Sequence, residues 1–354
     1  MRTSSRLPLS GLLPLIGLVS LAGCVEYEYA SFEGVDVFYQ DPPSEVDILM
    51  VVDNSCSMDP YQEKLAENFQ EFISFFIDAN VDYQIGVVTT TVSEAVPVPE
   101  NGCSQADVDA IPEGGHLVGG AFITEDTPDA EEKFSTYVNL GICGSGYEMG
   151  LESAYRAVTD RDALADNGQF LRDEASLSMI FVANEEDYSP LGVNEYINTF
   201  RDVKGQRSRD VFNASALVVQ DLEDCSQREI NAGASEGSRY LDVAKQTGGI
   251  RASICDDDFE SIVTDLSLNS SRLTDTFYLS SLPAAGSLSV TVDETELPCE
   301  DGGWTYVLTR NEADDEVGAI VFDRDEIPEP GSQVTIRYNE GDGAEDSFCS
   351  AEDD

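Results

Sequence analysis

The sequence predicts an α/β protein whose doubly wound, mostly parallel sheet carries helices on both faces and is followed by a small antiparallel β-sandwich. Across 45–270, short apolar runs alternate with segments whose apolar residues recur every three or four positions. This alternation of strands and helices is typical of a parallel sheet covered on both faces. From residue 275 onward only short β-type runs follow, separated by Pro, Gly and acidic turns, which favours a separate β-sandwich.

The α/β region, 45–270, opens with the apolar run 45–52, which is expected to be its first strand. The next segment repeats apolar residues at helical spacing and predicts a helix that packs on the sheet: Tyr61, Leu65, Phe69, Phe72 and Phe76. By the same criteria, we predict strands over 81–91, 177–183, 211–219 and 250–254, and helices over 147–158, 193–203, 238–246 and 259–268. Residues 92–133 form a long polar insertion, a length typical of functional or flexible loops.

The C-terminal domain, 275–354, is predicted to be the β-sandwich. Its expected strands are the short runs 277–279, 288–292, 304–308, 319–322 and 334–338, and Trp304, the single tryptophan, is expected in its core. Residues 24–44, before the α/β region, are acidic, contain scattered aromatic residues and lack helical periodicity. We interpret them as a tether.

The N-terminus has the pattern of a secretory signal over 1–23. Arg2 and Arg6 precede a mostly apolar stretch, which is too short for a convincing membrane span. The following Leu21-Ala22-Gly23-Cys24 resembles a bacterial lipoprotein box. This resemblance implies that Cys24 carries lipid and holds the protein to the cell envelope. Val25, in place of an aspartate, favours the outer membrane. The alternative is an ordinary signal peptide.

The composition is strongly acidic, with 69 Asp and Glu against 19 Lys and Arg, and a formal net charge of -50. Such a surface repels phosphate backbones, which excludes nucleic acid as a partner. The hydrophobic content of 41% is nevertheless enough to build folded cores.

Eight cysteines in a secreted chain predict disulfides. Cys225 and Cys255 would close a loop of roughly 30 residues, worth about 3–4 kcal/mol in the loop-entropy model. Cys299 and Cys349 can close the C-terminal domain. Cys103 can pair with Cys143, which leaves Cys56 free. A Cys56–Cys143 pair is the rival arrangement.

The most informative motif is Asp53-Asn54-Ser55-Cys56-Ser57, directly after the first predicted strand. The carboxyl ends of parallel strands form the edge where open α/β sheets bind ligands. One carboxylate and two hydroxyls at alternate positions suit a hard divalent cation. The Asp-x-Ser-x-Ser pattern resembles the metal-ion-dependent adhesion site of von Willebrand factor A domains, and the resemblance covers about 45–270.

The resemblance implies that two further loops supply ligands. Ser145, in Gly144-Ser145-Gly146, stands where the family usually has threonine, and Asn184 follows a strand where the family has aspartate. An amide brings no charge, so it lowers the expected cation affinity and leaves the ion more positive for an incoming carboxylate. Three acids after Asn184 are possible supporting ligands: Glu185, Glu186 and Asp187.

The function implied by this resemblance is divalent-metal adhesion. Mg²⁺ is the expected cofactor, with Mn²⁺ or Ca²⁺ as replacements, and the partner is a protein that presents a Glu or Asp carboxylate. The alternative is a metal-independent envelope scaffold in which Asp53 and Ser55 merely cap the following helix. An enzyme is not expected, because His116, the sole histidine, lies in a polar loop and Cys56 has no visible base.

Overall fold

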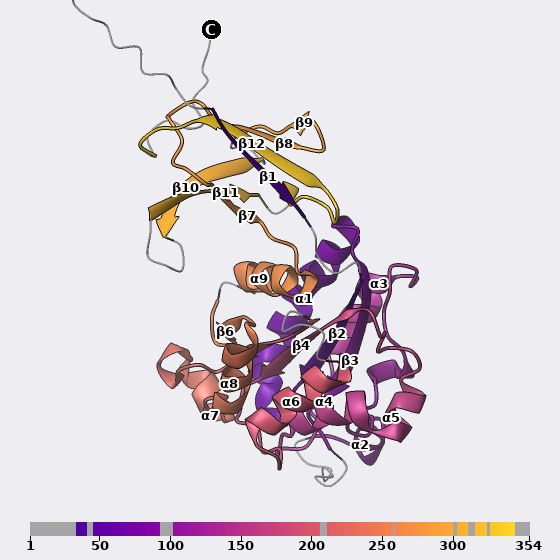
Figure 1. Cartoon of the computed structure of the whole chain (residues 1–354). Helices are drawn as coiled ribbons and strands as arrows, with labels where there is room; N and C mark the ends of the chain where they lie inside the picture. Colours follow the sequence, from indigo (N-terminus) through magenta and orange to yellow (C-terminus); the bar gives the residue numbers. More distant parts are fainter. Residues whose placement is uncertain are drawn as a thin grey trace, which may run out of the picture. The chain divides into compact units, whose positions relative to one another are not determined.

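The computed structural model is a mixed α/β protein with one parallel sheet and separate antiparallel sheets (Figure 1). It describes residues 33–40, 45–92, 102–205, 211–257, 259–299, 303–310, 316–323 and 326–343. The predicted signal segment and Cys24 lie outside these described residues. No helix in the described ranges is long and apolar enough to cross a membrane.

The parallel sheet has five strands in the order β3-β2-β4-β5-β6. All four neighbouring pairs are parallel, as the alternation of strands and helices predicts. The strands are β2 (Glu45–Val52), β3 (Asp82–Thr89), β4 (Ser176–Ala183), β5 (Phe212–Val218) and β6 (Arg251–Ser253). Every residue of β4 and β5 is buried, which explains why their sequences are continuous rather than alternating apolar runs.

Helices pack on both faces of this sheet. On β2, Ile48 and Met50 belong to one hydrophobic cluster, and Leu49 and Val51 to another, because successive side chains of a strand point to opposite faces. The first cluster includes apolar residues of α1 (Asp59–Asp78), α3 (Ala130–Val138) and α9 (Phe259–Ser271). The second includes those of α4 (Gly150–Thr159), α6 (Val193–Val203) and α8 (Ser238–Thr247).

Shorter helices complete the α/β region: α2 (Gln105–Asp109), α5 (Arg161–Asp166) and α7 (Gln227–Ala232). There are also the 3-10 turns η1 (Cys56–Met58), η3 (Val118–Gly120) and η5 (Leu222–Asp224). The described part of the predicted insertion is more ordered than its polar sequence suggests. It contains α2, and Ile123 pairs with Ile85 of β3 through two backbone hydrogen bonds of 2.8 Å.

Two antiparallel sheets form the remaining region. One has the order β1-β12-β8-β9 and the other β10-β11-β7. The strands are β1 (Glu33–Tyr39), β7 (Thr276–Tyr278), β8 (Ser289–Val292), β9 (Thr295–Glu296), β10 (Trp304–Arg310), β11 (Glu316–Phe322) and β12 (Gln333–Asn339). Residues from both sheets share one hydrophobic cluster, and Trp304 is buried in it, so its predicted core position is confirmed.

The structure corrects the prediction that residues 24–44 are only a tether, because part of this segment forms the strand β1. Residues 33–39 fall within 24–44, yet they form a strand that pairs antiparallel with β12 along all seven residues. Asp36 of β1 accepts hydrogen bonds from the Tyr338 hydroxyl (2.8 Å) and from Ser280, which ties this acidic segment to the antiparallel sheets. The partners of β1 lie about 300 residues later, so local sequence does not reveal them.

The disulfides resolve one of the open alternatives. Cys103 pairs with Cys143, Cys225 pairs with Cys255, and Cys56 is free and exposed. The rival Cys56–Cys143 pair is therefore wrong. Cys299 is also disulfide-bonded, whereas Cys349 lies outside the described residues, and their pairing stays a prediction.

Candidate metal centre

Asp53 lies where β2 ends, at the carboxyl edge of the parallel sheet. Its backbone N–H donates to the Val182 carbonyl of β4 (2.8 Å), and its side chain is fully buried. Oδ1 accepts the Ser55 N–H (2.8 Å) and the Thr90 hydroxyl (3.4 Å). Oδ2 has no hydrogen-bond partner among the described residues. Burial, reinforced by the charge of Glu185, raises the pKa of Asp53 to about 6.

Three more predicted ligands lie beside Asp53. The hydroxyls of Ser55 and Ser57 are 2.7 Å apart, and the Ser57 hydroxyl donates to Oδ1 of Asn184 (3.1 Å). All three side chains are buried. The structure therefore brings the loop after β2 and the loop after β4 together, as expected when two parallel strands end at the same edge.

The hydroxyl of Ser145, the predicted ligand from the loop before α4, makes hydrogen bonds within that loop. Its hydroxyl accepts the Tyr147 N–H (3.0 Å) and donates to the Tyr147 carbonyl (3.4 Å), so it is used within its own loop. Its backbone N–H donates to the hydroxyl of Thr91 (2.9 Å). No described contact joins it to Asp53, Ser55 or Ser57. Ser145 thus shapes the loop, and its role as a metal ligand stays a prediction.

Glu148, from the same loop, is the residue that sequence reasoning missed. It is fully buried, and neither carboxyl oxygen has a hydrogen-bond partner among the described residues. Burial raises its pKa to about 8, and the negative charges of Asp53 and Glu185 act in the same direction. These interactions place the three carboxyl groups near one another. The available signal was a glutamate two residues before an amphipathic helix that begins at the ligand-binding edge.

The backbone fixes Glu148 between two other loops. Its carbonyl accepts the Tyr188 N–H (2.8 Å), and the next residue, Met149, donates its N–H to the Thr90 carbonyl (3.0 Å). These bonds connect the loop before α4 to the segments after β3 and β4. A side chain at this position is therefore held inside the site rather than in solvent.

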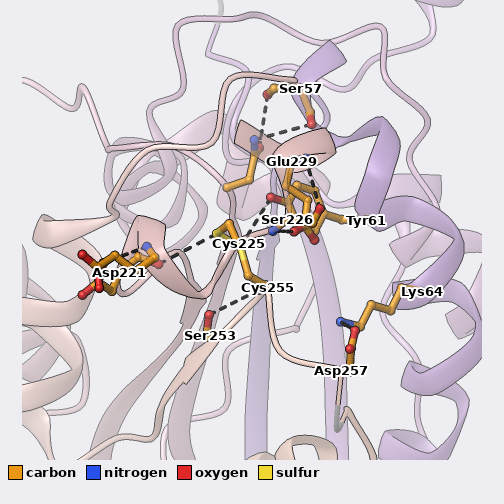
Figure 2. The surroundings of a disulfide bond; sticks show 12 residues. Ser57, Tyr61, Lys64, Asp221, Cys225, Ser226, Glu229, Ser253, Cys255 and Asp257 are labelled. Carbon is orange, nitrogen blue, oxygen red and sulfur yellow. Dashed lines mark hydrogen bonds and ion pairs between the residues drawn. A yellow bond between two sulfur atoms is a disulfide. The ribbon is translucent and has the colours of Figure 1, made fainter. Parts of the chain in front are cut away.

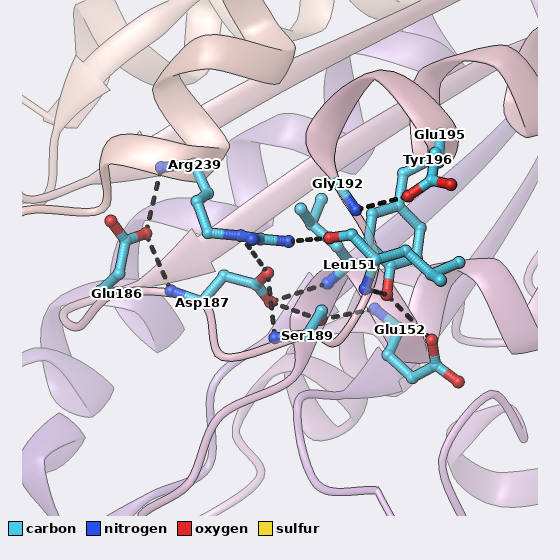
Figure 3. Close-up of polar contacts among 10 residues, drawn as sticks. Leu151, Glu152, Glu186, Asp187, Ser189, Gly192, Glu195, Tyr196 and Arg239 are labelled. Carbon is cyan, nitrogen blue, oxygen red and sulfur yellow. Dashed lines mark hydrogen bonds and ion pairs between the residues drawn. The ribbon is translucent and has the colours of Figure 1, made fainter.

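The acids after Asn184 divide into two groups. Glu185 is partly buried, which raises its pKa, while the nearby Ser57 hydroxyl opposes the shift. It thus lies on the Ser57 side of the site. Glu186 instead accepts the backbone N–H groups of Asp187 (2.9 Å) and Arg239 (3.0 Å), as Figure 3 shows. Glu186 is directed toward the start of α8.

Asp187 supports the neighbouring helices and not the cation position. Its Oδ1 accepts the N–H of Leu151 in the first turn of α4 (3.1 Å) and the Ser189 hydroxyl (2.7 Å). Its Oδ2 pairs with Nε of Arg239 (3.0 Å; Figure 3). Because these donors occupy both oxygens, Asp187 is a poor candidate for a metal ligand.

The donor types present suit a divalent cation, although ligand atoms of Asp53, Glu148 and Glu185 do not all lie within 4.8 Å of one another in this structure. Asp53 and Glu148 together offer three buried carboxyl oxygens without partners, next to the hydroxyls of Ser55 and Ser57. A buried acid without a compensating partner is unfavourable, and a cation with oxygen ligands satisfies it. Ligands come from the loops after β2 and β4 and from the loop before α4. An ion here would join three separate segments.

A second group of potential ligands lies near Ser57. Single ligand atoms of Cys225, Glu229 and Cys255 all lie within 4.8 Å of one another (Figure 2). The two sulfur atoms are bonded to each other, and the Glu229 carboxylate accepts the Ser226 N–H (2.6 Å) as part of the α7 capping box. The group is therefore a disulfide and a helix cap, without thiolates for a metal.

Comparison with known proteins gives no family. No family model matches the chain, and no curated protein matches it. The solved structure of the pilus adhesin SpaC from Lactobacillus rhamnosus GG, in its open conformation, is similar with a TM-score of 0.41 and 12% identity, over 88% of this chain and 41% of that chain. Proximal thread matrix protein 1 from the mussel byssus is similar with a TM-score of 0.39 and 9% identity, over 68% and 50%. The chain spans half or less of both, and likenesses this weak carry no argument about function.

Proposed function

We propose that this chain binds one divalent cation through Asp53, Glu148 and Glu185, with Ser55 and Ser57, and recognises a protein partner in a cation-dependent way. The observation that carries the proposal is the set of buried oxygens without partners, Oδ2 of Asp53 and both carboxyl oxygens of Glu148. Asn184, whose amide accepts from Ser57, orients a hydroxyl ligand. In the proposal, the cation supplies the positive charge that balances the carboxylates of Asp53, Glu148 and Glu185.

The proposal includes a von Willebrand factor A fold for 45–270. In its support, the sheet order β3-β2-β4-β5-β6 leaves Asp53, Ser55 and Ser57 after the carboxyl end of β2, an inner strand with a neighbour on each side. Helices on both faces and the contact between the loops of Asp53 and Asn184 are what such a domain requires. The position of Glu148 is this chain's own departure from the expected hydroxyl ligand.

Mg²⁺, Mn²⁺ and Ca²⁺ all suit the available donors, because each prefers carboxylate and hydroxyl oxygens. The sequence led us to expect a partner whose Glu or Asp completes the coordination of an under-neutralised ion. Glu148 changes the charge count, since three carboxylates carry one more negative charge than a divalent cation. In our proposal the ion therefore mainly orders the three loops that the partner contacts.

The envelope location remains part of the proposal and rests on the sequence of residues 1–24, which lie outside the described residues. Lipid on Cys24 would attach the protein to the outer membrane, where recognition of another protein serves adhesion or envelope assembly. A metal-independent scaffold is the competing proposal, and it predicts partner binding that a chelator does not change.

Calorimetric titration of Mg²⁺, Mn²⁺ and Ca²⁺ into the chain tests the site. We expect saturable binding that Asp53→Ala abolishes and Glu148→Gln weakens by at least about tenfold. Ser145→Ala is the matched control from the same loop, and it should retain binding because its hydroxyl is used by Tyr147. Unchanged binding in Asp53→Ala, or no binding by the unmodified chain, would contradict the proposal.

A further inference from the structure

Two exposed tyrosines form a stacked pair beside the candidate metal centre. The rings of Tyr147 and Tyr188 have centroids 4.8 Å apart with an interplanar angle of 17°. The two residues are 49% and 46% exposed. In every other ring pair of the described residues at least one ring is buried. This pair thus presents aromatic surface to solvent.

The pair is fixed in place by the same backbone contacts that hold Glu148. Tyr147 directly precedes Glu148 and donates its N–H to the Ser145 hydroxyl (3.0 Å), while Tyr188 donates its N–H to the Glu148 carbonyl (2.8 Å). These contacts position the rings, and the proposed cation would hold their loops in one conformation, so that binding a partner costs little conformational entropy. Tyrosine is also among the residues that contribute most to protein–protein binding energy.

Charge indicates which chemical group the pair accepts. The chain has a formal net charge of -50, and three interacting carboxyl groups, those of Asp53, Glu148 and Glu185, belong to the same group of loops as the two tyrosines. Even with a divalent cation bound, this group keeps one excess negative charge. Arg239, the basic side chain nearby, is occupied by Asp187 and the Leu191 carbonyl. An approaching carboxylate meets repulsion here, whereas a basic group is attracted to the acids and to the electron-rich ring faces.

We propose that Tyr147 and Tyr188 dock a segment of a partner protein through an arginine or lysine side chain that lies over the exposed ring faces. The inference rests on the proposed function, in which the cation orders the loops that carry the two rings. It replaces the bridging carboxylate with a basic partner group. The stacked arrangement leaves one outer face on each ring, so a partner with two neighbouring basic residues fits best.

Binding of short labelled peptides to the full chain tests this docking surface. The probes are a Gly-Ser peptide with two central arginines and matched peptides with two glutamates or two glutamines, measured by fluorescence anisotropy with Ca²⁺ at about 0.15 M salt, where distant charges are screened. We expect the arginine peptide to bind most tightly. Tyr147→Ala and Tyr188→Ala should each weaken its binding roughly three- to thirty-fold, the range of a cation–π contact.

Two controls separate the rings from the general acidity of the chain. Tyr278→Ala removes a tyrosine that is 53% exposed on β7 and should leave arginine-peptide binding unchanged. Tyr147→Phe keeps the ring and should bind like the unmodified chain. Tightest binding of the glutamate peptide, no measurable binding of the arginine peptide, or equal effects of Tyr278→Ala and Tyr147→Ala would overturn the inference.

The same experiment distinguishes this inference from the proposed function. Calorimetric cation binding should be intact in Tyr147→Ala, because the tyrosine ring supplies no ligand. Arginine-peptide binding that depends on Tyr147 but is unaffected by a chelator would refute the cation-dependent function and leave the docking surface standing. Normal cation binding without any ring-dependent peptide binding would refute the docking surface and leave the cation site standing.

Discussion

Asp53 and Glu148 are buried acids from different loops, and the charge of Asp53 raises the pKa of Glu148. Neither receives a basic partner among the described residues, although the chain can satisfy buried acids elsewhere, as Arg172 and Lys204 do for Asp47. A chain that leaves two neighbouring carboxyl groups unpaired loses stability at that position. This relationship is the reason to expect a cation between them.

Glu148→Gln should have opposite effects with and without cation. In chelator, the substitution removes a buried acid without partners and should raise the free energy of unfolding by about 1–2 kcal/mol. With Ca²⁺ or Mg²⁺, the variant should gain less stability than the unmodified chain. The stabilisation by a bound cation increases with its affinity, and the variant is expected to bind more weakly. Urea denaturation in both conditions measures this. A loss of stability in chelator would indicate that Glu148 serves the fold alone.

The stability of the cation-free protein should fall as pH rises. The pKa of Asp53 is raised from 3.8 to about 6 and that of Glu148 from 4.5 to about 8. At a pH between the unfolded and the folded pKa of each group, the folded state holds more protons than the unfolded state. Raising the pH through this range therefore favours unfolding. Thermal unfolding in chelator at pH 5 and pH 8 measures the trend. Glu148→Gln should flatten it, most clearly above pH 6.

Cation affinity should show the reverse dependence on pH. The same carboxyl groups must lose their protons before they bind a metal, so affinity should rise as the pH increases from 5 to 8. Calorimetric titration with Ca²⁺ at both pH values measures the effect. An affinity that does not depend on pH would exclude Glu148 as a ligand, since its raised pKa lies within this range.

The Cys103–Cys143 disulfide should support cation binding through the loop that carries Glu148. Cys143 precedes Gly144, whose N–H donates to the Asn54 carbonyl (2.6 Å) in the loop after β2. The double variant Cys103→Ser/Cys143→Ser should therefore bind the cation more weakly, by about tenfold, the effect typical of residues that orient ligands. Calorimetry measures this affinity. Arg228→Ala, which removes an exposed ion pair with Asp59, is the control with no expected effect.

The opposite edge of the sheet contains a buried ion cluster with a structural role. Asp47 at the start of β2 is fully buried and pairs with Arg172 (2.8 Å) and Lys204 (2.9 Å). Asp47→Ala would leave the buried Lys204 ammonium without its carboxylate, and we expect a loss of about 3–5 kcal/mol in the free energy of unfolding. Denaturation in urea measures it. Cation affinity of the folded variant should be unchanged, which would show that the two edges act independently.

The sequence by itself determined the five strands of the parallel sheet and the helices α1, α4, α6, α8 and α9 between and after them, but not the helices α2, α3, α5 and α7. Apolar periodicity located β2, α1 and α6 closely, because each of these elements buries one continuous face or run. The loop of Asp53, Ser55 and Ser57 was also readable, since a strand's end and its ligand-type residues are adjacent in the chain. Such features depend on neighbours within a few residues.

Only the tertiary structure decided which distant residues complete these features. Ser145 and Glu148 lie in one loop, and both side chains carry oxygen atoms that can bind a metal. Backbone hydrogen bonds to Thr90 and from Tyr188 hold Glu148 inside the site. The Ser145 hydroxyl instead bonds to Tyr147, and its N–H to Thr91. The pairing of β1 with β12 likewise joins segments about 300 residues apart. Burial and strand pairing between distant segments depend on three-dimensional packing, for which local periodicity carries no signal.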